Sequence, residues 1–210
     1  MTTWMVKQMG EIRNAERTRK AIVEAAREEF FEKGYSGTRI ESIARRAGVN
    51  KQLIYHYFKG KEHLIQETID SFVTSLPTGK ITLPDNPADI AAFRLKVNLD
   101  HLREFLKFTA WEAVESIPEN SRGEKARKKV LESYNEHMKK QQVEGKVPGE
   151  LDPALITLMM SSLTIYPLLY PNVTRMITGR TLDEPEFQEQ WAQYLQRICE
   201  RIFRQEDNPV

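Results

Sequence analysis

The chain of 210 residues has one cysteine, Cys199, so it cannot form an internal disulfide, as is typical of a reducing compartment. It has no run of about 18 apolar residues, which argues against a membrane span. Residues 1–7 lack the apolar core of a secretory signal, so we expect a cytoplasmic protein. Glycine-rich phosphate loops and the Gly-x-Ser-x-Gly, His-Glu-x-x-His and Cys-x-x-Cys motifs are also missing. We therefore expect neither an enzyme nor a cofactor.

The histidines do not suggest a metal site. His56, His63, His101 and His137 include no close pair, and Cys199 is far from all of them in the sequence. Because a metal site needs several ligands at short, defined spacings, we expect no bound metal.

The formal net charge of +1 conceals a division along the chain. Residues 1–63 contain 13 Lys and Arg against 8 Asp and Glu, a balance of +5, and the remaining 18 against 22 give −4. Positive charge is therefore concentrated in the first third, where it would attract a polyanion such as DNA. Arg13, Arg17, Arg19 and Lys20 can reach a DNA backbone or an adjacent minor groove, and they can equally be solvated helix charges.

Helical spacing of apolar residues runs through almost the whole chain, which predicts an all-α fold. We expect a first helix over about 14–33, ended by Gly34, and a fourth over about 61–76 that stops before Pro77. Asn86 and Pro87 predict a capped helix start, with a break near His101 before Glu115. Pro118 and Asn120 separate this region from the next helix. Further helices are predicted at about 121–144, 153–170 and 184–205.

Residues 38–59 carry the pattern of a helix-turn-helix, two short helices joined by a tight turn. Thr38 and Glu41 have the spacing of a capping box. Gly48 can take the left-handed conformation that ends the first helix, and Asn50 is a good N-cap for the second. The apolar residues have helical spacing and predict a buried face: Ile40, Ile43, Ala44, Ala47, Val49, Leu53, Ile54 and Tyr57.

The second helix of this pair keeps a polar face outward. Gln52, Tyr55, His56 and Lys59 share one stripe, with Lys51 beside it and no acid in the stripe. Such a face suits the DNA major groove, where Gln pairs with adenine and Lys with guanine. The alternative is the solvated surface of a small helical pair, although such a surface would normally also carry Glu and Asp.

Residues 13–64 resemble the N-terminal domain of the TetR family of transcriptional regulators. The resemblance rests on the corner at Gly34-Tyr35-Ser36-Gly37-Thr38, the Ile-Ala-x-x-Ala-Gly-Val turn at 43–49, and Tyr-x-Tyr-Phe-Lys-x-Lys-Glu-x-Leu at 55–64. It implies a three-helix DNA-binding domain over residues 1–60 and a helical ligand-binding and dimerisation domain over residues 61–210. It also implies that Thr38 and Tyr55 contact phosphates.

Other contacts carried over from the family are less uniform. Lys51, Gln52 and His56 would face bases or the adjoining backbone, and Lys61 would hold a phosphate at a helix N-terminus. Tyr57 is ambiguous, since its spacing places it partly in the core while family members often use this position on a phosphate. The predicted DNA-binding set is Thr38, Lys51, Gln52, Tyr55, His56, Tyr57, Lys59 and Lys61.

The middle helices would then enclose an effector pocket. Aromatic and soft apolar residues with a few polar groups suit a mid-sized, mainly apolar molecule, although each of them can also be ordinary core. The candidates are Phe93, Val97, His101, Phe105, Phe108, Trp111, Tyr134, His137, Met138, Met159, Ser162 and Tyr166.

The last two predicted helices carry more apolar surface than one protomer needs, which is typical of an interface. In the TetR family the corresponding helices pair with their copies in a four-helix bundle, so the resemblance implies a homodimer. The alternative is an ordinary monomer core. The predicted interface on the last helix is Phe187, Trp191, Tyr194, Leu195, Ile198 and Ile202.

The prediction for function is a transcriptional regulator, a repressor, that binds a palindromic operator as a homodimer and is released by a small, mainly apolar effector. Two alternatives stay open. One is a non-inducible protein of the same fold that organises chromosomes or blocks another machine, such as that of cell division. The other is an all-helical binding protein or enzyme in which the motif is vestigial.

Overall fold

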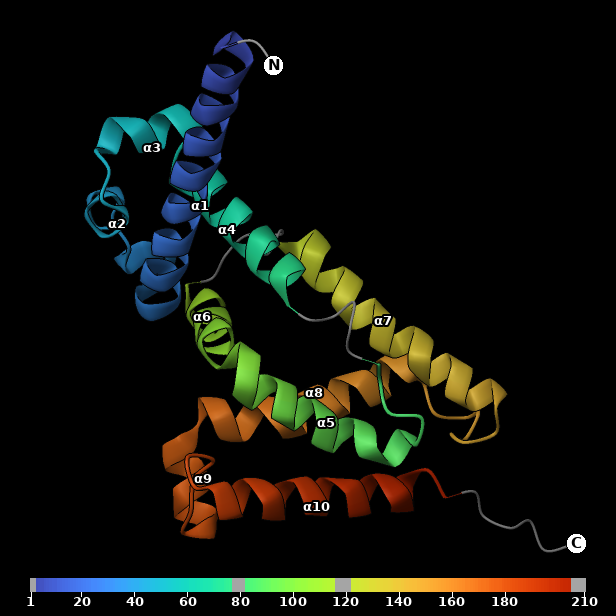
Figure 1. Ribbon diagram of the computed structural model, residues 1–210. Coiled ribbons are helices and arrows are strands. Elements are labelled where there is room, and N and C mark those ends of the chain that lie inside the picture. Colours follow the sequence, from blue (N-terminus) through green and yellow to red (C-terminus); the bar gives the residue numbers. More distant parts are fainter. Residues whose placement is uncertain (1–2, 77–81, 116–121, 205–210) are drawn as a thin grey trace, which may run out of the picture. The chain divides into compact units, whose positions relative to one another are not determined.

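The computed structural model describes residues 3–76, 82–115 and 122–204, and these fold into helices without a strand (Figure 1). The all-α prediction is confirmed. The helices are α1 Thr3–Gly37, α2 Ile40–Ala47, α3 Lys51–Tyr57, α4 Lys61–Ser75, α5 Ile90–Val97, α6 Arg103–Val114, α7 Glu124–Val143, α8 Pro153–Leu169, α9 Pro171–Thr178 and α10 Pro185–Ile202. A 3-10 turn, η2 (Pro87–Asp89), precedes α5, and a π-helical turn, η3 (Asn98–Leu102), follows it. The predicted separators Pro118 and Asn120 lie outside the described residues.

The chain divides into two compact units. Unit 1 comprises residues 1–75 and 107–126, and unit 2 comprises 76–106 and 127–210. The end of α6 and the first turn of α7 therefore belong to the same unit as the helix-turn-helix. The functional division after residue 60 remains a prediction.

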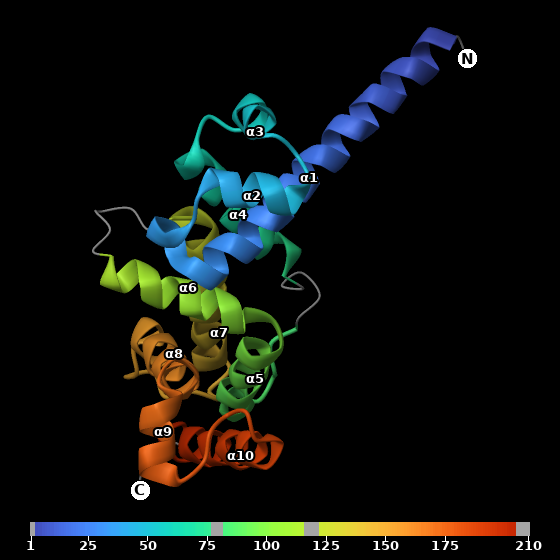
Figure 2. The same ribbon diagram turned by 90° about the vertical axis from the view of Figure 1, so that its left-hand side faces the viewer.

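In unit 1, both α2 and α4 pack against helix α1 (Figures 1 and 2). Its apolar residues Ile22, Ala26, Phe30 and Phe31 are all in the core, at most 5% exposed. The helix begins well before the predicted start at about residue 14. Gly34 interrupts its helical dihedrals with φ 69° and ψ 179°, close to the predicted end.

The predicted capping box at Thr38 is wrong. The N-cap of α2 is Arg39, whose side chain makes no capping hydrogen bond. The hydroxyl of Thr38 instead donates to the carbonyl oxygens of Glu29 (2.9 Å) and Gly34 (2.8 Å) of α1. The residue is 2% exposed, and its hydroxyl links the start of α2 to the last turns of α1.

Helix α4 begins at Lys61 and ends at Ser75, as predicted. Its buried residues include Leu64, Ile65 and Ile69. The start of α7 packs directly on it: the Gly123 amide donates to Gln66 Oε1 over 2.9 Å. Gly123 has a φ of 68°, and a Cβ there would overlap Ile69. This close approach therefore requires glycine.

Unit 2 is built around α5, which packs against α8 and α10 (Figure 1). The predicted helix start near residue 86 is confirmed, because Asn86 Oδ1 accepts from the amide of Ala88 over 3.1 Å. The predicted break near His101 is also confirmed, and its form is the π-helical turn η3. The core contains Ile90, Leu95 and Leu195, each at most 1% exposed.

Helix α8 has the predicted extent, but the sequence analysis missed α9. Asp152 caps α8 through two backbone amides, and Pro171 opens α9 directly after Tyr170. No single described helix is long and apolar enough to cross a membrane, whereas α8 and α9 meet the length and composition criteria only as a pair bent by 93°.

Candidate functional site

The turn between α2 and α3 fixes the orientation of α3. Gly48 adopts the left-handed conformation with φ 67° and ψ 30°, and the Val49 amide donates to the Ala44 carbonyl over 3.0 Å. Asn50 Oδ1 then accepts from the Leu53 amide over 2.7 Å, as expected of an N-cap. Ile54 is fully buried. Both predictions for the turn, at Gly48 and Asn50, are confirmed.

Ion pairs hold α2 on α1. Arg46 of α2 contacts Glu28 at 2.7 Å and the buried Glu29 at 2.9 Å. Burial raises the pKa of Glu29, but Lys33 and Arg46 together outweigh it, so the pKa is lowered overall. Glu29 is therefore held ionised, and Arg46 is used for positioning α2.

Three residues of the predicted stripe, Gln52, Tyr55 and His56, are exposed on α3, and Ile54 on the opposite face is buried. Lys59 is also exposed, but α3 ends at Tyr57 and Phe58 is extended, so Lys59 does not continue the helical stripe. Tyr55 is 50% exposed, and Lys51 Nζ lies 5.8 Å from the centre of its ring. A short helix fixed on one side and polar on the other is suited to entering a major groove.

Lys51 has an acidic neighbour that the helix pattern did not reveal. Its Nζ lies 2.5 Å from Glu41 Oε1 of α2, and the pair is exposed. This contact raises the pKa of Lys51 and lowers that of Glu41. A phosphate or base contact by Lys51 would have to replace this ion pair.

Tyr57 and Lys61 lie apart from the exposed stripe. Tyr57 is half-buried, with its ring 5.3 Å from that of His56. Lys61 Nζ lies 4.2 Å from the centre of the Tyr35 ring, against which the Arg122 guanidinium also packs at 3.7 Å. Burial lowers the pKa of Lys61, opposed by Glu115. Lys61 therefore packs against the side chain of Tyr35 near the end of α1.

The structure argues against Thr38 as a DNA-binding residue. Its side chain is 2% exposed and its only proton is directed at carbonyls of α1. A hydroxyl in this position cannot also donate to a phosphate.

Unit 2 brings together several of the predicted effector residues. Met138 is in its core, and Tyr134 and Met159 pack against that core. The His137 ring lies near the Pro84 carbonyl, with Nε2 at 3.2 Å. Phe93 and Val97 are half-buried, Phe105 is buried and His101 is exposed.

Four predicted effector residues lie elsewhere. Phe108 and Trp111 belong to unit 1, because α6 continues into that unit: Phe108 packs on Phe31 with ring centres 5.5 Å apart. Ser162 and Tyr166 are exposed on α8 and do not face the buried interior of unit 2. The prediction that these four line one enclosed pocket is therefore corrected.

Comparison with known proteins identifies the helix-turn-helix region. Residues 22–68 match the family described as bacterial regulatory proteins, tetR family. Residues 22–68 thus form a DNA-binding domain of the TetR family. The chain is also 26% identical over 173 residues to the HTH-type transcriptional repressor SCO4008 of Streptomyces coelicolor, covering 80% of this chain and 86% of that protein. The matched domain and this relative together indicate a DNA-binding transcriptional regulator.

Solved structures share the fold of this chain. The putative transcriptional regulator SCO4942 of Streptomyces coelicolor superposes with a TM-score of 0.66 at 21% identity, covering 90% of this chain and 99% of that one. The transcriptional regulator FadR of Bacillus subtilis, in complex with stearoyl-CoA, gives 0.64 at 18% identity, covering 88% and 99%.

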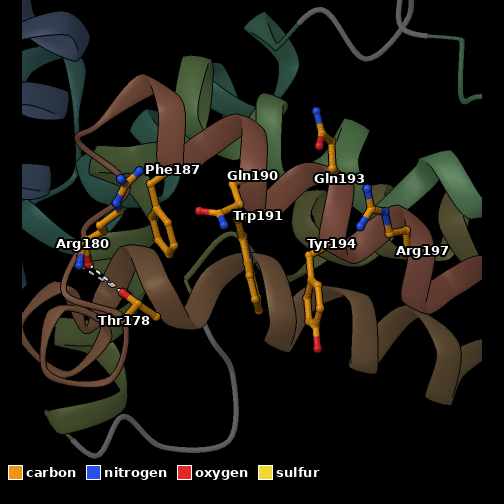
Figure 3. Close-up of a pocket in the computed structure, with 8 residues that line it drawn as sticks. All are labelled: Thr178, Arg180, Phe187, Gln190, Trp191, Gln193, Tyr194 and Arg197. Carbon is orange, nitrogen blue, oxygen red and sulfur yellow. Dashed lines mark hydrogen bonds between the residues drawn. The ribbon is translucent and has the colours of Figure 1, made fainter.

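The predicted interface residues of this chain divide into two groups. Phe187 and Leu195 are buried in the core of unit 2, at 6% and 0% exposure, so they offer a partner almost no surface and that part of the prediction is corrected. Tyr194 is 55% exposed, and Trp191, Ile198 and Ile202 are half-buried. Figure 3 shows Trp191 and Tyr194 projecting from α10 in one direction, with ring centres 5.8 Å apart.

The hollow beside these rings has a volume of about 670 Å³ (Figure 3). It is lined by Thr178, Arg180, Phe187, Gln190, Trp191, Gln193, Tyr194 and Arg197. Exposed apolar side chains also line up on α8: Leu155 at 65%, Leu158 at 61% and Tyr166 at 47%. Trp191 Nε1 donates to the Leu163 carbonyl over 3.2 Å, so α8 and α10 are adjacent here.

The sequence analysis missed a group of buried polar residues in unit 2. Arg94 and Asn98 lie one turn apart on the α5 side, and Thr157, Ser161 and Thr164 lie on α8. A signal was available: the three α8 positions follow the i, i+4, i+7 spacing of one helix face within an otherwise apolar segment.

Proposed function

We propose that this protein is a ligand-responsive repressor that binds a palindromic operator as a homodimer and leaves it when a small molecule binds unit 2. The observation that carries the proposal is the exposed row Gln52, Tyr55 and His56 on α3, with exposed Lys59 just after the helix; the other face of α3 is fixed by buried Ile54 and by the Asn50 cap. Base-edge contacts from such a helix give sequence specificity, whereas phosphate contacts give position.

A dimer follows from the length of α3. Helix α3 spans only Lys51–Tyr57, so one copy can read only a few base pairs. Two copies about 34–36 Å apart read two half-sites one helical turn apart, which raises both affinity and specificity. The exposed apolar residues of α8 and α10, centred on Leu158 and Tyr194, are the surface that we propose for pairing.

A response to a ligand is supported by two helices that have residues in both units. Helices α6 and α7 each contribute residues to both units, so a change in their unit 2 portions is carried through helix backbone into unit 1. The fold likeness to FadR, solved with stearoyl-CoA, is consistent with a mainly apolar effector. Release requires that the effector bind the released conformation more tightly than the DNA-bound one.

The experiment is selection of duplexes from a random pool by the native protein, followed by footprinting. We expect a two-fold symmetric site with half-site centres one helical turn apart. Binding across a genome should then be confined to a few promoters. Many dispersed sites would instead indicate a chromosome-organising protein, and failure to retain any duplex would indicate a vestigial motif.

The release step is tested by comparing how much the effector weakens DNA binding with how much DNA weakens effector binding. A molecule that displaces the selected duplex must bind the DNA-bound protein more weakly, by the same factor as it weakens DNA binding, typically about 5–150-fold. Equal affinity of that molecule with and without saturating duplex would show that it is not the effector.

A further inference from the structure

Arg94 is a buried cation in unit 2. The residue is 6% exposed on α5, and its Nη2 donates to Ser161 Oγ of α8 over 2.5 Å. Its Cζ lies 4.2 Å from the centre of the Tyr134 ring of α7. Burial lowers the pKa of Arg94, but an arginine starts from so high a value that it stays charged.

Within the described part of the chain, this charge has no carboxylate partner. Arg94 forms no ion pair there, and its Nη1 is buried without a hydrogen-bond acceptor. Other arginines are paired although they are more exposed: Arg46 contacts Glu28, and Arg103 contacts Asp183 at 2.6 Å. An uncompensated buried charge is strongly destabilising, so a negative group bound beside Arg94 would be stabilised.

The surroundings of Arg94 combine polar groups with apolar side chains. Asn98 Nδ2 donates to Thr164 Oγ1 over 3.2 Å, and the buried hydroxyl of Thr157 has no partner in the described chain. The same three helices supply apolar core residues, including Met138 and Met160. Unbranched methionine side chains can repack around an inserted molecule.

We propose that Arg94 is the anion-binding residue of the effector site and that the effector is an organic acid with one carboxylate on an apolar or aromatic body. This inference rests on the proposed function, because it names the chemical class of the effector. The planar guanidinium matches the geometry of a carboxylate. One carboxylate also neutralises one guanidinium, whereas a dianionic phosphate would leave a buried negative charge.

The first test compares two substitutions without any ligand. Arg94→Met removes the buried charge and keeps most of the volume, and Arg103→Met is its matched control on the surface-exposed ion pair. We expect the thermal midpoint of Arg94→Met to equal or exceed that of the native protein. A midpoint for Arg94→Met below that of Arg103→Met would show that Arg94 serves the fold, and would overturn the proposal.

The second test measures ligand preference by the shift of the thermal midpoint and by titration calorimetry. The probes are matched acids and primary amides: benzoate and benzamide, 1-naphthoate and 1-naphthamide, decanoate and decanamide. We expect the native protein and Arg103→Met to bind at least one acid about 10–100-fold more tightly than its amide. In Arg94→Met this preference should disappear.

Three results would overturn the proposal: no acid preferred in any pair, a preference that survives in Arg94→Met, or tighter binding of 1-naphthyl phosphate than of 1-naphthoate. DNA retention by the Arg94→Met protein is measured in parallel. Loss of duplex binding by native protein and variants alike would count against the proposed function, while the acid preference would still report on Arg94.

Discussion

The side chains of α3 show that spatial neighbours determine whether a residue is available to contact DNA. Lys51 and Lys59 look equivalent in the sequence, yet Lys51 is paired with Glu41 across the turn. Gln52 and His56 have no acidic contact in the described chain and remain exposed. We therefore assign base reading to Gln52 and His56 before Lys51.

Removing these two side chains should affect specific binding only. Gln52→Ala and His56→Ala are each expected to weaken binding to the selected duplex by about 1–3 kcal/mol while leaving binding to random duplexes nearly unchanged. Fluorescence anisotropy at one fixed salt concentration measures both. Lys139→Ala on α7, where Lys139 pairs with Glu136, is the control and should change neither. Equal losses on both kinds of duplex would show that Gln52 and His56 are not readers.

The buried hydroxyl of Thr38 gives a prediction about stability. Thr38→Val keeps the shape but leaves the Glu29 and Gly34 carbonyls without this donor, and should cost about 1–3 kcal/mol in the free energy of unfolding. Thr18→Val is the control, because the exposed Thr18 hydroxyl donates to the Asn14 carbonyl over 2.9 Å. Denaturant unfolding compares the two. If Thr38 contacted phosphate instead, the variant would weaken binding to selected and random duplexes alike and keep its stability.

Cys199 should be chemically inert in the folded protein. The residue is 0% exposed, and burial raises the pKa of its thiol to about 11. Because the thiolate is the reactive species, we expect negligible labelling by iodoacetamide at pH 8 and complete labelling in denaturant, as read by mass spectrometry. Rapid labelling without denaturant would mean that α10 opens readily.

At the scale of elements, helix starts and close approaches decide the arrangement within each unit. Asn50, Asn86 and Asp152 cap α3, η2 and α8 as their residue types suggest. Gly123 acts differently, because it lets the start of α7 lie against Ile69 of α4. Arg122 strengthens the same contact through Glu62 at 3.1 Å.

The approach of α7 to α4 can be tested with two glycines of similar conformation. Gly123→Ala and Gly179→Ala both place a side chain at positive φ, 68° and 75°, at a cost of about 1–2 kcal/mol. Only at position 123 does the added Cβ also meet Ile69, which should cost about 1–3 kcal/mol more. The free energies of unfolding measure the difference. Equal losses would indicate that the contact between α4 and α7 yields without strain.

At the scale of the whole molecule, the exposed apolar residues of α8 and α10 bear on assembly. Leu158→Glu and Tyr194→Glu should give monomers that no longer bind the selected duplex, since a charge buried in an apolar interface has no partner. Sedimentation equilibrium measures the mass. Leu131→Glu on α7 is the control, because Leu131 is 46% exposed but lies outside the proposed surface. Dimers that persist in both variants would place the interface elsewhere.

Local signals in the sequence determined the helices, the turn at Gly48 and Asn50, and the outward face of α3, because capping and helical spacing depend on residues only a few positions apart. Tertiary structure decided what depends on distant residues. It turned Thr38 into a buried donor, paired Lys51 with Glu41, and moved Phe108 and Trp111 into unit 1. It also buried Arg94 without an acidic partner among the residues that the structure describes, and this becomes visible only when all three surrounding helices are in place.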